Sequence, residues 1–194
     1  MEERKKHEIH WVNREDANFP ERLKKLTGMP KKLYYIGNLP DPAKPSAAVV
    51  GARMSSPYGR CQAFKYARTM AEHGVQIISG MARGIDSEGH KGALDTDTPT
   101  FAVLGSGVDV CYPESNRRLY ERILEKGGGI ISELPPGTKP QNWTFPARNR
   151  IISALSDVVV IVEAKERSGS LITADFALEQ GKDIYAVPGR MYDA

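Results

Sequence analysis

The stretch KPQNWTFPARNR, residues 139–150, combines cations and aromatic rings without an acid. Lys139, Arg148 and Arg150 supply the positive charges, and Trp143 and Phe145 supply the rings. Such a combination suits an unpaired nucleic-acid strand, because bases stack on rings while cations follow the phosphates. A helix start whose rings fill the core and whose arginines face water has the same composition. We expect one ring, Phe145 before Trp143, to be partly buried and the other to contact nucleic acid.

Short apolar strands alternate with helices along most of the chain. We predict strands at 33–36, 47–50, 75–79, 100–104, 129–132, 157–162 and 183–187, and helices at 57–72, 85–94, 116–126, 146–156 and 173–180. Unbroken apolar runs indicate strands buried on both faces, and the alternation predicts right-handed crossovers. The predicted fold class is α/β, a doubly wound, mainly parallel sheet of the Rossmann-like kind. Residues 1–45 form a lead-in segment (helix, turn, strand) that we expect to pack on the main domain, residues 46–194.

Ligands of such sheets bind in the crevice outside the carboxyl ends of the strands. Four of the five predicted loops at this edge are rich in glycine, serine or threonine and lead towards a helix N-terminus, where free N–H groups and the helix dipole favour an anion. The binding candidates in the loops are Gly51, Arg53, Ser55, Ser79, Gly80, Arg83, Gly105, Gly107, Ser168, Gly169, Ser170 and Thr173, with Asn149 as a neutral hydrogen-bonding group from the opening stretch.

Several arginines admit two interpretations. Arg53 follows the first strand of the main domain, where it can hold a phosphate with two hydrogen bonds or pair with a carboxylate of the domain itself. Arg83 can contact a ligand or form an ion pair with Asp86, three residues further on. Arg117 and Arg118 begin the third predicted helix, and we expect at least one of them to face water.

Motifs and composition exclude other classes. Val110 stands where a dinucleotide fingerprint needs its third glycine, and no acid ends the strand GIIS, so NAD is not expected. The Walker motif of ATP hydrolysis is missing, and the four histidines lack the spacing of a metal site, so we expect no cofactor. The start, MEERKKHEIH, is not a signal peptide, and the apolar run VVVIV is too short to span a membrane. With two cysteines expected to be reduced and a net charge of +3, we expect a cytoplasmic protein that can bind a polyanion.

The blocks VVGARMSSPYG, ISGMARGID, GSGVDVCYP, SELPPG, FPARNRIISALSDVVVIVEA and SGSLITADFALEQGKDIYAVPG follow one another in the order in which they resemble the DprA/Smf family of DNA-processing proteins. The likeness covers about residues 19–190. It implies an extended Rossmann fold that binds single-stranded DNA in a basic pocket, forms homodimers and loads a RecA-type recombinase during natural transformation, without being an enzyme. By position, the resemblance assigns phosphate or DNA contacts to Arg53, Arg117 or Arg118, Arg148, Arg150, Ser168, Ser170 and Thr173, and base stacking to Phe145.

Two alternatives share this fold. Phosphoribohydrolases that act on nucleoside monophosphates carry a P-G-G-x-G-T-x-x-E signature, whereas the matching loop here is RSGSLITADFAL, without the catalytic glutamate. Glu133 or Glu163 is the remaining candidate acid for such a reaction. A nucleotide-sensing module without turnover is the other alternative. Many members of the family carry further terminal domains, and we expect the Rossmann-like domain to be truncated at its C-terminus.

Overall fold

The structure is a computed structural model that describes residues 7–165 and 168–189. Its strands are β1 (His10–Asn13), β2 (Lys32–Gly37), β3 (Ser46–Val50), β4 (Gln76–Ser79), β5 (Thr100–Val103), β6 (Gly129–Ser132), β7 (Val158–Ile161) and β8 (Asp183–Ala186). Its helices are α1 (Glu21–Lys24), α2 (Pro57–Glu72), α3 (Ile85–Ala93), α4 (Arg117–Glu125), α5 (Thr144–Leu155) and α6 (Gly169–Glu179), with a 3₁₀ turn, η1 (Glu114–Asn116).

The strands form one eight-stranded sheet in the order β1-β2-β6-β5-β4-β3-β7-β8. From β6 to β8 neighbouring strands are parallel, whereas β2 is antiparallel to both β1 and β6. The chain proceeds outward from β3 through β4 and β5 to β6, then returns to β7 on the other side of β3. The predicted doubly wound, mainly parallel Rossmann-like sheet is confirmed, and its switch point lies between β3 and β7.

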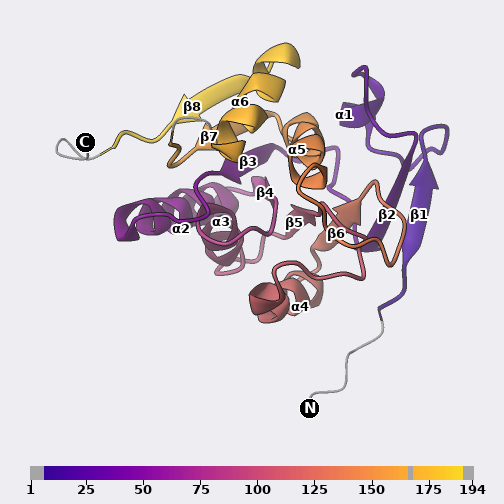
Figure 1. Ribbon diagram of the computed structural model, residues 1–194, viewed down its shortest axis with the longest axis horizontal. Helices are drawn as coiled ribbons and strands as arrows, with labels where there is room; N and C mark the ends of the chain where they lie inside the picture. Colours follow the sequence, from indigo (N-terminus) through magenta and orange to yellow (C-terminus); the bar gives the residue numbers. More distant parts are fainter. Residues whose placement is uncertain (1–6, 166–167, 190–194) are drawn as a thin grey trace.

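Helices cover both faces of the sheet: α1, α5 and α6 lie on one face, and α2, α3 and α4 on the other (Figure 1). Under the first set, Phe19 and Leu23 of the lead-in segment share a core with Ile151 and Leu155 of α5. Ser56 caps α2 by accepting a hydrogen bond from Gly59 N at 3.0 Å, and proline follows at the first helical position. Among the described helices, none has the length and apolar character needed to cross a membrane.

The outermost strands differ from the predictions. No strand was predicted over residues 10–13, yet they form β1, which pairs with the later strand β2. Strand β8 was expected to be buried on both faces, and this was wrong: among the described strands it pairs only with β7, and Tyr185 is 57% exposed. An edge strand lacks the neighbour that would cover it, so an apolar run alone did not determine its burial.

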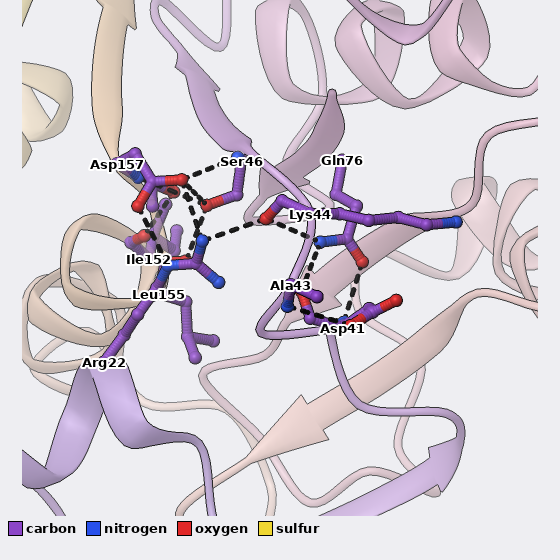
Figure 2. Close-up of polar contacts among 10 residues, drawn as sticks. Arg22, Asp41, Ala43, Lys44, Ser46, Gln76, Ile152, Leu155 and Asp157 are labelled. Carbon is purple, nitrogen blue, oxygen red and sulfur yellow. Dashed lines mark hydrogen bonds and ion pairs between the residues drawn. The ribbon is translucent and has the colours of Figure 1, made fainter. Parts of the chain in front are cut away.

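A polar network joins the lead-in segment to the amino edge of the sheet (Figure 2). Arg22 of α1 donates from Nε and Nη2 to the two carboxylate oxygens of Asp157, at 3.0 and 2.9 Å. The same carboxylate accepts from the backbone N–H of Ser46, at the start of β3, at 2.8 Å. Beside it, Gln76 of β4 exchanges two hydrogen bonds with the backbone of Asp41. The network therefore fixes the beginnings of β3, β4 and β7, and with them the opposite, carboxyl edge.

Candidate nucleic-acid interface

A cleft of about 440 Å³ opens at the carboxyl edge, at the switch point of the sheet. Its walls are the loop after β3, the loop after β7 and the first turns of α5 and α6. The predicted binding residues that line it are Gly51, Arg53, Phe145, Arg148, Asn149, Ser168, Gly169, Ser170 and Thr173. The loops after β3 and β7, on the two sides of the switch point, thus bring nine of the predicted residues together.

Phe145 forms an aromatic wall of this cleft. Helix α5 starts two residues earlier than predicted, at Thr144, whose hydroxyl donates to Gly105 O at 2.5 Å and fixes the first turn. Phe145 is half-buried, and its Cδ1 would lie 2.9 Å from a Cβ atom at Gly105, so glycine makes room for the ring. The exposed guanidinium of Arg53 lies 4.9 Å from the ring centroid, and the ring of Tyr112 lies 5.4 Å from it. A cation and a second ring therefore meet at Phe145.

Arg148 lies at the floor of the cleft and is only 4% exposed. Its Nη1 donates to the carbonyl oxygens of Gly80, at 2.7 Å, and of Val103. A Cβ atom at Gly80 would lie 2.3 Å from this nitrogen, so the guanidinium fits only beside glycine. Burial lowers the pKa of Arg148 to about 10, although the nearby carboxylate of Asp86 raises it. Its Nε has no hydrogen-bond partner among the described residues.

Asp86, on the first turn of α3, is the acid at this floor. Burial raises the pKa of Asp86 to about 6, against the lowering effects of Arg148 and of the backbone N–H groups of Ala82 and Gly80. The carboxyl group therefore remains half protonated near pH 6. The predicted alternative, an ion pair between Arg83 and Asp86, does not form in the described part of the chain: Arg83 is exposed, and Asp86 faces Arg148 and Arg53 instead.

The N-terminus of α6 supplies polar lining to the same cleft as Phe145. The hydroxyl groups of Ser168 and Ser170 are 2.7 Å apart, and Asn149 Nδ2 donates to Gly169 O at 3.0 Å, which ties this turn to α5. Exposed Lys165 stands on the rim just before it. Free N–H groups at the start of this 11-residue helix, a hydroxyl pair and a lysine favour an anion on this side of the cleft.

The N-terminus of α2, by contrast, is filled by the chain itself. Glu163, two residues after the end of β7, accepts from the backbone N–H and the hydroxyl of Ser56, at 3.0 and 2.8 Å. A Cβ atom at Gly59 would lie 2.1 Å from the same carboxylate. In dinucleotide-binding folds the pyrophosphate occupies this helix end. In this chain the carboxylate of Glu163 occupies that position instead.

The remaining predicted residues lie outside the lining of the cleft. The hydroxyl of Ser79 is buried and donates to Val49 O at 2.6 Å. Arg117 pairs with Glu114 at 3.3 Å, and Arg150 pairs with Glu133. Gly80, Gly105 and Gly107 support neighbouring groups, Ser55 is buried, and Arg83, Arg118, Lys139 and Trp143 are exposed elsewhere. Trp143 is 67% exposed, so Phe145 is the more buried ring, as predicted.

Sequence reasoning did not assign Asp86 and Lys165 to the site. Asp86 was considered only as a partner of Arg83, although it and His90 recur at helical spacing among buried residues of α3. His90 is itself fully buried, and its Nδ1 lies 2.8 Å from Thr100 Oγ1, which agrees with a packing residue. Within the described ranges, no cluster of side chains could hold a metal ion. Cys61 is exposed and Cys111 is buried, and both are free thiols.

Fold and cleft together define a Rossmann-like α/β protein whose switch-point cleft has basic, aromatic and hydroxyl-bearing walls. A family profile described as DNA recombination-mediator protein A matches residues 10–194. The chain belongs to this family.

Similar proteins agree with this assignment. Protein Smf of Escherichia coli (strain K12) is 43% identical over 180 residues, which cover 93% of this chain and 48% of that protein. The X-ray structure of DprA from Streptococcus pneumoniae aligns with a TM-score of 0.88 at 40% identity, over 95% of this chain and 65% of that one. The structure of DprA from Helicobacter pylori, described for its single-stranded DNA binding mode, aligns with a TM-score of 0.86 at 31% identity. The alignment covers 97% of this chain and 84% of that one. The chain spans about half the length of the curated relatives that match first.

Proposed function

We propose that this chain binds single-stranded DNA in the switch-point cleft. The observation that carries the proposal is the meeting of Arg53 and Tyr112 at the Phe145 ring, in a cleft that the N-terminus of α6 also lines. One wall offers rings on which unpaired bases stack, and the other offers N–H and hydroxyl groups to phosphate. The single-stranded DNA binding of the Helicobacter pylori relative supports the same assignment.

The role proposed for each residue of the cleft follows from how exposed its side chain is. Arg53 and Lys165 are exposed at the rim and hold phosphates, whereas buried Arg148 keeps the floor in place through Gly80 and Val103. Phe145 stacks on a base. The exposed residues predicted elsewhere on this edge, Lys139 and Trp143, extend the interface beyond the cleft.

A titration of fluorescent oligothymidylate against duplex DNA of the same length tests this proposal. We expect the single strand to bind more tightly, because rings stack only on unpaired bases. Arg53→Ala should weaken binding and reduce the slope of log affinity against log salt by roughly 0.7, the value for one phosphate contact on a single strand. Arg122→Ala, which removes an exposed arginine from the last turn of α4, is the matched control.

Phe145→Ala should lose about 1 to 3 kcal/mol of affinity with little change in the salt slope, since stacking releases few counterions. A melting curve accompanies this variant because the ring is half-buried. Equal affinity for single-stranded and duplex DNA would contradict the stacking role of the cleft.

At the level of the whole protein, we propose that the bound strand is passed to a RecA-type recombinase, in natural transformation or recombination, by a homodimer. The description of the family as a recombination mediator supports this step. The test is filament assembly by a RecA-type protein on DNA covered with single-strand-binding protein, with and without this chain. No acceleration by the wild-type protein would contradict the mediator role.

We propose no catalysis by this chain. The two acids that a phosphoribohydrolase reaction would use are engaged elsewhere: Glu133 pairs with Arg150, and Glu163 caps α2. Incubation with nucleoside monophosphates tests this, and release of free base that is lost in Asp86→Asn, the acid of the cleft floor, would favour the hydrolase instead.

A further inference from the structure

A second cluster of rings and charge lies on the β1–β2 pair, away from the cleft. The Lys32 ammonium stands 4.2 Å from the ring centroid of Trp11 and 5.0 Å from that of Tyr34. Trp11 and Tyr34 are directly opposite each other in the antiparallel register, so both rings and the lysine share one face of the strand pair. We call these three residues the β1–β2 platform.

The β1–β2 platform lies at the same edge of the sheet as the cleft. Tyr34 is in register with Ser132, the last residue of β6, and Lys32 lies two residues further in the direction of the carboxyl edge. Figure 1 shows β1 and β2 at the end of the sheet beyond β6. Four strand spacings separate β3 from β2, and five separate it from β1, a distance of roughly 19–24 Å.

The exposure of Trp11 indicates a binding surface. Trp11 is 56% exposed, whereas its neighbour Val12 is fully buried and holds the strand against the core. Among the described residues, no carboxylate lies within 4.0 Å of Lys32, so its charge is not neutralised by an acid there. An exposed indole with an uncompensated ammonium beside it offers what one nucleotide of a single strand needs: a face for the base and a cation for the phosphate.

We infer that the β1–β2 platform is a second base-stacking site for the same unpaired DNA strand, reached after the strand leaves the cleft. This inference rests on the proposed function of the cleft. It adds that the DNA runs across the carboxyl edge, over β4, β5 and β6, rather than ending at the switch point. Exposed Trp143 and Lys139 belong to the segment that leads from β6, the neighbour of β2, to α5 at the cleft.

Tryptophan fluorescence tests the platform directly, since the chain has two tryptophans. In Trp143→Phe, Trp11 is the sole tryptophan, and stacking on a base should quench its emission. Two oligothymidylates are compared at saturation: one of about 16 nucleotides and one of about 4, which at a stacked spacing of about 3.4 Å is too short to reach from the cleft. We expect quenching by the long strand and none by the short one.

Affinity measurements complete the test. For the long strand only, Trp11→Ala should weaken binding about fivefold and Trp11→Phe should largely restore it, because phenylalanine keeps a ring. Lys32→Gln should lower the salt slope by roughly 0.7 for the long strand. Tyr185→Ala, which removes an exposed ring from the opposite end of the sheet, is the matched control and should bind as wild type. A melting curve of Trp11→Ala separates lost binding from lost folding.

The outcomes are distinguishable. If the long strand binds while Trp11 emission and the affinity of Trp11→Ala stay unchanged, the platform does not contact DNA and Lys32 only stabilises the strand pair. If the wild-type protein binds neither strand, the proposed function of the cleft fails, and the inference fails with it. Quenching by the long strand alone, with the fivefold loss, supports both.

Discussion

Replacing Asp86 with asparagine measures the electrostatic strain at the floor of the cleft. The carboxyl group is 6% exposed, lies near Arg148 and Arg53, and has a pKa raised from 3.8 to about 6, with burial as the dominant cause. Burial outweighs the two arginines because the ionised carboxylate loses more hydration free energy than it gains from their electrostatic attraction. The folded state therefore prefers the protonated acid.

The sign of the effect on stability follows from this shift. Below the pKa of the unfolded chain, about 3.9, Asp86 is protonated in both states and costs nothing. As pH rises from there through about 6, the folded protein holds a proton that the unfolded chain has released, so the free energy of unfolding falls. At about 1.36 kcal/mol for each pKa unit, a shift of about two units corresponds to about 3 kcal/mol lost by pH 7.

Urea unfolding of the wild-type protein and of Asp86→Asn, at pH values from about 4 to 7, gives this quantity as a difference between the two proteins. Groups other than Asp86 contribute alike to both and cancel. We expect the wild type to lose about 3 kcal/mol relative to Asp86→Asn across the range. A difference that is flat, or in which the wild type gains with rising pH, would refute the argument, because it would mean that Arg148 holds Asp86 as an ordinary ionised partner.

Three further changes probe the elements around the site. Gly80→Ala should destabilise the protein by about 1 to 3 kcal/mol in urea unfolding, because the added methyl group meets the guanidinium of Arg148; an unchanged midpoint would mean that this side chain moves freely. Glu163→Ala should lower the melting temperature by removing the acceptor at the N-terminus of α2, equivalent to about 0.5 to 2 kcal/mol, and a loss of DNA binding without a loss of stability would instead place Glu163 in the interface. Asp157→Asn should lower the urea midpoint at pH 7 but not in acid. Burial raises the pKa of Asp157, yet hydrogen bonds from Arg22 and Ser46 lower it overall. The contribution of Asp157 to the free energy of unfolding therefore disappears as pH falls, which is the opposite pH dependence to that of Asp86.

The interior strands of the sheet were predictable from the sequence because each of them contains an unbroken apolar run. From β3 to β6 every residue of the strands is buried, and each apolar run was found within a residue or two of its bounds. The switch-point location of the cleft then followed from the order of strands and helices. Local pattern and tertiary environment agree in these elements, which is why composition alone identified them.

Arg148 shows where the prediction of the site reached its limit. It was predicted to contact phosphate, and it lines the cleft, but its guanidinium is buried on backbone carbonyl groups. Its position relative to Ile151, Ile152 and Leu155, at helical spacings of three, four and seven, places it on the buried face of α5. That periodicity was available in the sequence. The fit of the guanidinium beside Gly80 was not, because those residues are 68 positions apart.

The lead-in segment has a consequence for how this chain is made. Arg22 and Asp157 are 135 residues apart, and β2 finds its inner neighbour only when β6 exists. At about 5 to 20 residues per second, a ribosome needs roughly 7 to 27 s to synthesise the chain between the two ends of that ion pair. Until α5 has been synthesised, Phe19 and Leu23, at most 1% exposed in the finished fold, lack the helix with which they share a core. The first part of the described chain to be synthesised is thus among the last to reach its native contacts.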